Sequence, residues 1–166
     1  GQLDVCGQCN GDGTTCATAE LSFGTFDSSG SVEILYDFGG PVAAFQFEVT
    51  GLDLTGGSSL NGMDVVALGS TVAGYNALNN EIQAGTGVLT VLSFSAVTAG
   101  TSSISLGWGG AVGSAAGIEY AVTFGDDLTH QSDCAGTFYG NLVDDACGDC
   151  GGGVPDTDGD GVCDTD

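Results

Sequence analysis

Hydrophobic and polar residues alternate with a period of two in several short runs of this chain, and this pattern limits the fold more than any other feature. Residues 32–38 read V-E-I-L-Y-D-F, residues 45–50 read F-Q-F-E-V-T, and residues 118–124 read I-E-Y-A-V-T-F. Side chains alternate between the two faces of a β-strand, so each run predicts a half-buried antiparallel strand. No segment shows the 3.6-residue apolar period of an amphipathic helix, and we expect none.

Further strands are expected between turns rich in Gly, Ser, Asn and Thr. Residues 88–97 suit a central strand, because their first half is apolar on both faces. The other candidates are residues 20–26, 63–68, 71–75 and 103–108. About eight or nine short strands, with 42% hydrophobic residues to form a core, predict an all-β fold, a β-sandwich of the jelly-roll type.

The cysteines divide the chain into three parts. None lies between residues 17 and 133, and we therefore predict a cysteine-rich connector over 1–17, the sandwich over 18–125 and an acidic connector over 126–166. Small, glycine-rich ends bury little apolar surface, so disulfides formed in an extracellular compartment are expected to stabilise them. An odd number leaves one cysteine free or paired outside the chain, and the pairing stays open. The seven are Cys6, Cys9, Cys16, Cys134, Cys147, Cys150 and Cys163.

The two C-x-x-C pairs, Cys6 with Cys9 and Cys147 with Cys150, also have the spacing of a structural zinc site. We favour disulfides over zinc, because the three further cysteines and the uncompensated acidity point to an oxidising exterior.

The charge of the chain is all of one sign. Seventeen Asp and five Glu face no Lys or Arg, which gives a formal net charge of −22, and eleven of these acids fall in residues 126–166. Nucleic acid and anionic membranes are excluded as partners, since binding them needs basic side chains. Bound metal cations would relieve the repulsion; ordinary screening by salt is the alternative.

The acidic end carries a predicted calcium site. Residues 156–161 read D-T-D-G-D-G, a spacing that supplies hard oxygen ligands from one short loop. Its expected ligands are Asp156, Asp158, Asp160, the Val162 carbonyl and Asp164. No helices are expected beside the loop, so we do not predict an EF-hand. The string 156–164 resembles a thrombospondin type 3 calcium repeat.

Two other acidic stretches are weaker metal candidates. Asn10, Asp12 and Thr14 place oxygen side chains at alternate positions, although Asn-Gly and Asp-Gly are also ordinary turn sequences. The acids at 126, 127 and 133 are a third candidate without a diagnostic spacing.

The middle of the chain resembles a known family. Residues 41–54, P-V-A-A-F-Q-F-E-V-T-G-L-D-L, and residues 84–94, A-G-T-G-V-L-T-V-L-S-F, are similar to two recognisable stretches of cohesin-like domains. The resemblance implies a nine-stranded jelly-roll sandwich of the kind that holds partner modules in extracellular scaffolds. It supports the fold more strongly than it supports binding of a dockerin-like partner.

Little in the sequence favours catalysis. His130 is the only histidine, and we interpret it as a loop residue rather than as a general base. Trp108 would be able to stack on a sugar, but a single tryptophan near a strand end is expected more often in the core.

We therefore expect a non-enzymatic extracellular structural module, with other copies of itself as end-to-end partners. Residues 4–9, D-V-C-G-Q-C, resemble residues 145–150, D-A-C-G-D-C, as in one unit of a tandem array or filament. Without a signal peptide or an apolar run of about 18 residues, the chain reads as a mature secreted piece or a segment of a longer precursor. The alternative function is a binding module for a dockerin-like protein or a glycan.

Overall fold

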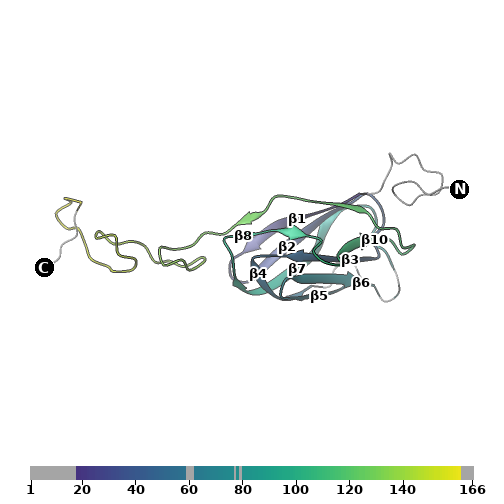
Figure 1. The fold of residues 1–166 in the computed structure, drawn as a ribbon, viewed down its shortest axis with the longest axis horizontal. Helices are drawn as coiled ribbons and strands as arrows, with labels where there is room; N and C mark the ends of the chain where they lie inside the picture. Colours follow the sequence, from purple (N-terminus) through teal and green to yellow (C-terminus); the bar gives the residue numbers. More distant parts are fainter. Residues whose placement is uncertain (1–17, 59–61, 77, 79, 162–166) are drawn as a thin grey trace. The chain divides into compact units, whose positions relative to one another are not determined.

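The computed structural model describes residues 18–58, 62–76, 78 and 80–161, and this part of the chain is all-β. The chain divides into two compact units, Gly1–Leu128 and Thr129–Asp166, which we describe separately. The first unit contains two β-sheets, shown with their strand labels in Figure 1, and confirms the predicted sandwich. No helix in the described residues is long and apolar enough to cross a membrane.

The first sheet has the strand order β11-β1-β2-β7-β4. Neighbouring strands run antiparallel except β1 and β11, which pair in parallel, with Thr18 opposite Ala121. The long strand β7 pairs with both β2 and β4, so the apolar run at residues 88–97 lies in a central strand, as predicted. The strands are β1 (Thr18–Asp27), β2 (Ser31–Phe38), β4 (Leu52–Gly57), β7 (Gly85–Val97) and β11 (Ala121–Phe124).

The second sheet has the order β10-β3-β6-β5, and a short strand β9 pairs with β3. All of its pairings are antiparallel. A separate two-stranded sheet joins β8 and β12. The strands are β3 (Ala44–Val49), β5 (Asp64–Leu68), β6 (Thr71–Tyr75), β8 (Thr101–Ser102), β9 (Ile104–Ser105), β10 (Ala111–Gly113) and β12 (Leu128–Thr129).

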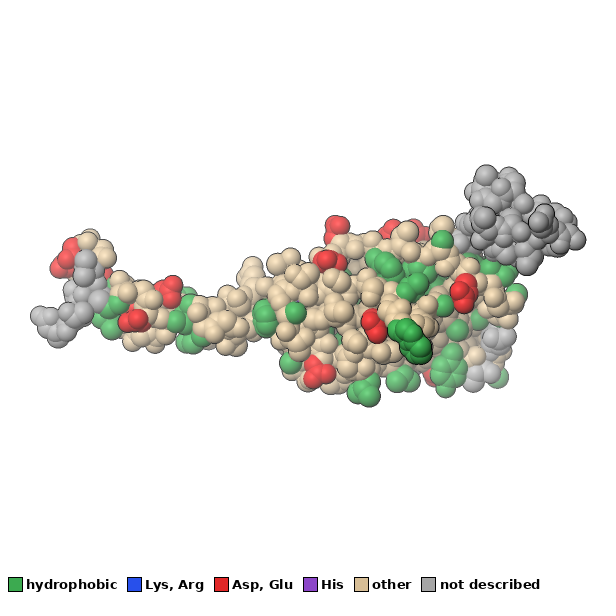
Figure 2. All heavy atoms as spheres, in the orientation of Figure 1, with side chains coloured by type: hydrophobic (Ala, Val, Ile, Leu, Met, Phe, Trp, Pro, Cys, Tyr) green, Lys and Arg blue, Asp and Glu red, His purple; other side chains and the backbone are tan. Residues whose placement is uncertain are grey.

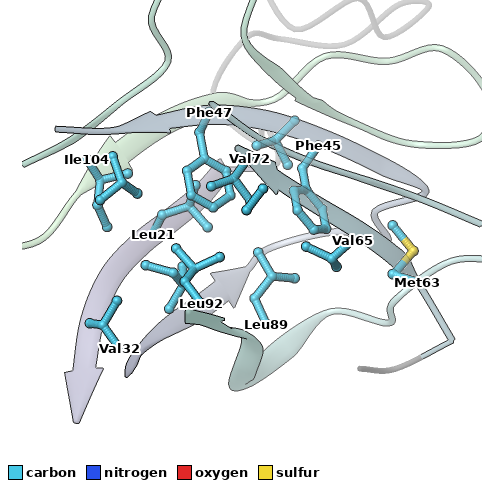
Figure 3. Packing of buried hydrophobic residues seen from close by; sticks show 14 of the residues in the cluster. Leu21, Val32, Phe45, Phe47, Met63, Val65, Val72, Leu89, Leu92 and Ile104 are labelled. Atoms are coloured by element: carbon cyan, nitrogen blue, oxygen red, sulfur yellow. The ribbon is translucent and has the colours of Figure 1, made fainter. Parts of the chain in front are cut away.

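The core contains the alternate apolar residues of both sheets. Figure 3 shows Leu21, Leu89 and Leu92 of the first sheet facing Phe47 and Val72 of the second. The rings of Phe45 and Phe47 stack with centroids 5.8 Å apart. Among the described residues, no buried side-chain nitrogen or oxygen lacks a hydrogen-bond partner. The period-2 pattern therefore identified the inward face correctly along β2 and β3.

Three expected strands differ in extent from those observed. Residues 103–108 form only the short β9, because the chain turns at Gly107-Trp108-Gly109. Only 121–124 of the run 118–124 form a strand, since Glu119 makes an isolated bridge to Gly113 of the other sheet. The central strand begins three residues earlier than expected, at Gly85. Strand β4 was not predicted.

Candidate binding face and candidate metal loop

The outer face of the second sheet carries large exposed hydrophobic side chains. Alternation on β5 turns Val66 and Leu68 outward, and they are 63% and 75% exposed. On β6 the outward Tyr75 is 54% exposed. The strand register places Val66 opposite Ala73, and Ala73 opposite Gln46 of β3, so small and uncharged residues continue the same face. Figure 2 shows hydrophobic side chains in green over the part of the sandwich where Figure 1 labels β3, β6 and β10.

The only tryptophan lies in a turn built from glycines between β9 and β10. Gly107 and Gly109, on either side of Trp108, have φ of 64° and 76°, a conformation that L side chains rarely adopt. A Cβ on Gly110 would lie 1.9 Å from the Leu106 carbonyl oxygen, so glycine is required there too. Trp108 is 94% exposed. The expectation that it belongs to the core is wrong, because the turn holds it in solvent.

An open groove of about 420 Å³ crosses the same face. Its floor is formed by small residues of three neighbouring strands, which leave room above the sheet where larger side chains would fill it. It is lined by Ala44, Gln46, Ala73, Tyr75, Gly109 and Ala111, with Glu119 at one side.

The two outer faces of the sandwich differ in charge. On the first sheet the outward positions include Glu20, Glu33 and Asp53, each between buried neighbours in its strand, and the exposed Asp37 beside the buried Phe38. On the second sheet the acids lie around the apolar residues. Asp64 lies opposite Tyr75, Glu119 lines the groove, and the Glu48 side chain lies against Gly107. The apolar face therefore has an acidic margin with no basic residue, since the chain contains none.

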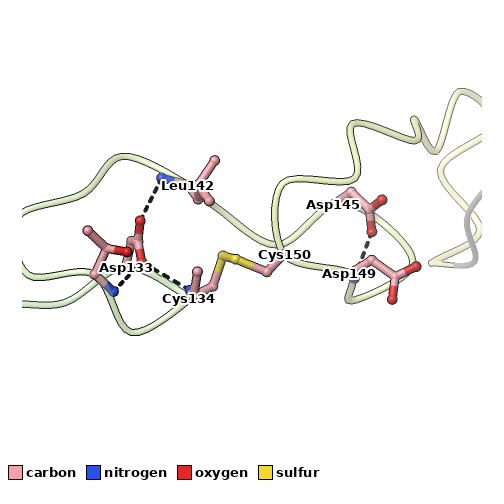
Figure 4. The surroundings of a disulfide bond; sticks show 8 residues. Asp133, Cys134, Leu142, Asp145, Asp149 and Cys150 are labelled. Carbon is pink, nitrogen blue, oxygen red and sulfur yellow. Dashed lines mark hydrogen bonds between the residues drawn. A yellow bond between two sulfur atoms is a disulfide. The ribbon is translucent and has the colours of Figure 1, made fainter.

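In the second unit, a disulfide joins Cys134 to Cys150, with Cα atoms 5.5 Å apart (Figure 4). Cys147 is disulfide-bonded as well. The zinc alternative for Cys147 and Cys150 is wrong for this structure, because zinc needs free thiolates and these sulfurs are in disulfides. The cysteines at 6, 9, 16 and 163 lie outside the described residues.

The acidic loop at the end of the described chain gathers three carboxylates. Carboxylate oxygens of Asp156, Asp158 and Asp160 all lie within 4.8 Å of one another. The loop curls around Asp156, whose Oδ1 accepts the Gly159 N–H at 2.9 Å and whose Oδ2 accepts the Gly161 N–H at 2.9 Å. The bond from Gly161, with smaller contributions from Asp158, Gly159 and Asp160, holds the pKa of Asp156 below its ordinary value. Hard oxygens at this spacing suit calcium.

Most of the other predicted ligands lie outside the described residues. Val162 and Asp164 of the same loop, and Asn10, Asp12 and Thr14 of the weaker candidate, lie outside the described residues. Of the third candidate, Asp133 is held by backbone amides.

His130 lies at the start of the second unit and is buried, with 6% of its surface exposed. Its Nδ1 lies 2.6 Å from the Tyr139 hydroxyl oxygen, and the two rings meet edge to face. Burial lowers the pKa of His130 and raises the pKa of Tyr139, so the neutral forms of both are favoured. The residue predicted as a loop histidine thus has a packing role in this unit.

Sequence reasoning missed the candidate binding face. Val66, Leu68 and Tyr75 read as ordinary strand residues, since an outward apolar residue gives the same alternation as an inward one. The available signal was the run Val65-Val66-Ala67-Leu68, which is apolar at every position of an expected half-buried strand.

Comparison with protein-family models and with curated proteins finds no match. Among solved structures, the chain is similar to a non-cellulosomal cohesin from the hyperthermophilic archaeon Archaeoglobus fulgidus. The two share 16% sequence identity and a TM-score of 0.43, and the match covers 65% of this chain and 86% of the other. The sandwich assignment itself follows from the strand order.

Proposed function

We propose that the chain is a non-enzymatic extracellular docking module, whose sandwich binds another protein through the outer face of the β10-β3-β6-β5 sheet. The observation that carries this proposal is the set of exposed hydrophobic residues on that face, Val66, Leu68 and Tyr75. Trp108 is included because its neighbour Gly109 lines the same groove as Tyr75. Soluble proteins rarely expose contiguous apolar patches of this kind unless they bind something there. Exposed aromatic residues are also common anchors at protein interfaces.

The charge around the face indicates the kind of partner. Glu48, Asp64 and Glu119 lie at the margin of the apolar residues, and the chain offers no Lys or Arg to an acidic partner. The complementary surface is therefore a hydrophobic projection flanked by Lys or Arg. A second copy of this chain does not fit that description, because it has no basic residues.

The test first identifies a partner protein and then measures its affinity for the chain. The parent chain, immobilised in oxidised form, is used to capture proteins from the medium of the producing organism, and a captured protein is identified and purified. Its binding to the parent chain and to Leu68→Glu is then measured by isothermal titration. We expect saturable binding to the parent chain and at least about a tenfold loss in Leu68→Glu, since a charge in a desolvated apolar contact typically costs that much.

A matched control separates the face from general effects of charge. Val143 is 74% exposed, almost the same as Leu68, but lies in the second unit, so Val143→Glu adds one charge at an equally exposed position. Binding should be unchanged in Val143→Glu. Equal affinity of all three chains for the captured protein would refute docking through this face. Saturable binding of a neutral oligosaccharide at the face instead would replace the protein partner by a glycan.

A second proposed function belongs to the connector, which we infer to be a calcium-binding, disulfide-bonded link of the kind found in extracellular structural proteins. The specific observation is the convergence of three carboxylates in a loop of a chain without Lys or Arg. Two unit charges about 4 Å apart repel by roughly 1 kcal/mol even in water, and a divalent cation would remove this cost. Asp156, Asp158 and Asp160 would hold the ion.

This site can be tested without knowing any partner. Calcium should bind the parent chain in isothermal titration and should fail to bind the double variant Asp158→Ala with Asp160→Ala. The double variant Glu20→Ala with Asp37→Ala removes the same charge from two exposed positions of the first sheet and should bind like the parent chain. No binding to the parent chain, or an equal loss in both variants, would eliminate the calcium proposal.

Joining of copies is the remaining part of this second function. If copies associate end to end, sedimentation velocity with calcium present and the cysteines oxidised should show species larger than a monomer. EDTA together with a thiol reductant should dissociate them. A monomer under both conditions would leave docking as the function and remove the assembly.

A further inference from the structure

Two consecutive segments of the second unit make the same backbone hydrogen bonds at a spacing of twelve residues. The Tyr139 N–H donates to the Gln131 carbonyl, and the Gly151 N–H donates to the Val143 carbonyl. The isolated bridge between Ser132 and Phe138 recurs between Asp144 and Cys150. Three more bonds to backbone carbonyls recur in the same way. In the first segment the N–H groups of Asp133 and Gly140 donate to Thr137, and that of Gly136 donates to Asp133. In the second segment the N–H groups of Asp145 and Gly152 donate to Asp149, and that of Gly148 donates to Asp145.

Each segment is organised around one aspartate. Asp133 Oδ1 accepts the N–H groups of Ala135 and Thr137 at 3.0 and 2.9 Å, and its Oδ2 accepts that of Leu142 at 3.4 Å. Figure 4 shows Asp133 with these bonds.

Asp145 repeats this arrangement twelve residues later. Its Oδ1 accepts the N–H groups of Cys147 and Asp149, each at 2.9 Å, and its Oδ2 accepts that of Val154 at 3.2 Å. The bond from Asp149, followed by those from Val154, Cys147 and Gly148, lowers the pKa of Asp145.

The backbone conformations repeat as well. Gly136 and Gly148 have φ of 81° and 82°, and Tyr139 and Gly151 have φ of 57° and 70°. A positive φ at Tyr139 is unfavourable for a residue with a Cβ. In the first segment this conformation occurs at the residue whose hydroxyl lies 2.6 Å from His130 Nδ1.

The aspartate carboxylates have little room for a cation. Backbone N–H groups hold them, as they hold Asp156, but the glycines beside them differ. An added Cβ would meet nothing within 4 Å on Gly159 or Gly161 of the acidic loop. A Cβ on Gly140 would lie 2.1 Å from Asp133 Oδ2, and one on Gly152 would lie 2.2 Å from Asp145 Oδ2, so each carboxylate packs directly on a glycine. Cys147, which lies near Asp145 and Asp149, is in a disulfide and offers no thiolate.

We propose that residues 131–154 are a metal-independent spacer made of two copies of one 12-residue turn unit, each folded around a single aspartate. The Cys134–Cys150 disulfide ties the first copy, 131–142, to the second, 143–154. Calcium dependence is then confined to the loop that follows, so that one connector combines a permanent spacer with a metal-dependent end. This last consequence rests on the proposed calcium site, whereas the spacer itself does not.

Hydrogen exchange of the full, oxidised chain tests the spacer directly. The amides of Ala135, Thr137, Leu142, Cys147, Asp149 and Val154 should be protected equally in EDTA and in calcium. Asp145→Ala should lower protection at Cys147, Asp149 and Val154 by about tenfold or more, because bonds to a charged acceptor are typically worth at least that factor.

Two further variants give the test its controls. Asp145→Asn keeps an oxygen for Cys147 and Asp149 but replaces Oδ2 with an amide that cannot accept, so protection should fall mainly at Val154. Asp144→Ala, which removes the adjacent exposed acid, should leave all six amides protected. Protection that requires calcium, or an equal loss in Asp144→Ala and Asp145→Ala, would overturn the proposal. Amides of the sandwich core serve as the reference for folding in every variant.

Discussion

At the scale of single residues, position decides the role of each hydrophobic or acidic side chain more than its type does. Trp108 is the largest apolar residue of the chain and lies in solvent, because the glycines beside it fix a turn that points away from the core. Asp133, Asp145 and Asp156 all accept backbone N–H groups. Their surroundings differ, because Asp133 and Asp145 each pack on a glycine, whereas Asp156 lies beside two further carboxylates.

Two substitutions in the tryptophan turn should therefore differ in their effect on the free energy of unfolding. Trp108→Ala should leave the free energy of unfolding within about 0.5 kcal/mol of the parent, since exposed side chains contribute little. Gly110→Ala should lower it by about 1–3 kcal/mol, because its Cβ would meet the Leu106 carbonyl. Urea denaturation followed by circular dichroism measures both. A larger cost for Trp108→Ala than for Gly110→Ala would contradict the placement of the turn.

At the scale of elements, the connector has a pH dependence of its own. The pKa of His130 is lowered by burial, and those of Asp145 and Asp156 are lowered by backbone hydrogen bonds. A group whose pKa is lowered on folding adds stability above its unfolded pKa and loses it as pH falls through the folded value.

Acidification should therefore loosen the connector in two stages. The contribution of His130 begins to fall below about pH 6.5, and that of the aspartates below about pH 4, these being their unfolded pKa values. Each loss is complete only below the lowered folded pKa of the group. NMR spectra recorded over this range should show changes at Tyr139 first and at Cys147, Asp149 and Gly161 later. A simultaneous change at all four residues, or stability that rises on acidification, would contradict these assignments.

The disulfide should carry much of the stability of the connector. Cys134 and Cys150 are separated by 16 residues, and closing a loop of that length is typically worth about 3 kcal/mol through the unfolded state. The variant Cys134→Ser with Cys150→Ser should lower amide protection across residues 131–154 while the β2 and β3 amides keep theirs. A loss of protection in the sandwich as well would show that the two units do not fold separately.

Sequence reasoning succeeded for elements with one buried face. Strands such as β2 and β3 follow from alternation alone, because their buried residues are apolar and recur at every second position. It failed where the backbone is fixed by side-chain to backbone bonds. The 12-residue turn units have no periodic hydrophobic pattern, and their organising residues, Asp133 and Asp145, look like ordinary acids in the sequence.

The candidate sites were predictable to different degrees for the same reason. The Asp-x-Asp-x-Asp spacing of residues 156–160 is local, so the sequence alone identified the loop whose carboxylates converge. The candidate binding face combines residues from β5 and β6, and only the strand register brings these together.

At the scale of the whole molecule, the division into two units predicts separate responses to core mutation. Phe47 is fully buried between the two sheets, and Phe47→Ala should destabilise the sandwich by about 3–5 kcal/mol. The turn units have their own hydrogen bonds and disulfide, so amide protection in residues 131–154 should persist when the sandwich amides exchange faster. Parallel loss in both units on exchange measurement would mean a single cooperative fold.

In the two proposed functions, the sandwich docks a partner and the connector supplies an extracellular link. The central claim is the docking face, and Trp108 is its built-in probe, since it is the only tryptophan and is 94% exposed. The most direct measurement is the fluorescence of Trp108 during titration with the purified captured partner. The partner is used in a form that contains no tryptophan, so that all of the indole emission comes from Trp108. The account predicts a saturable blue shift in the parent chain and none in Leu68→Glu. Saturable binding in which the Trp108 emission stays that of a solvated indole would contradict it.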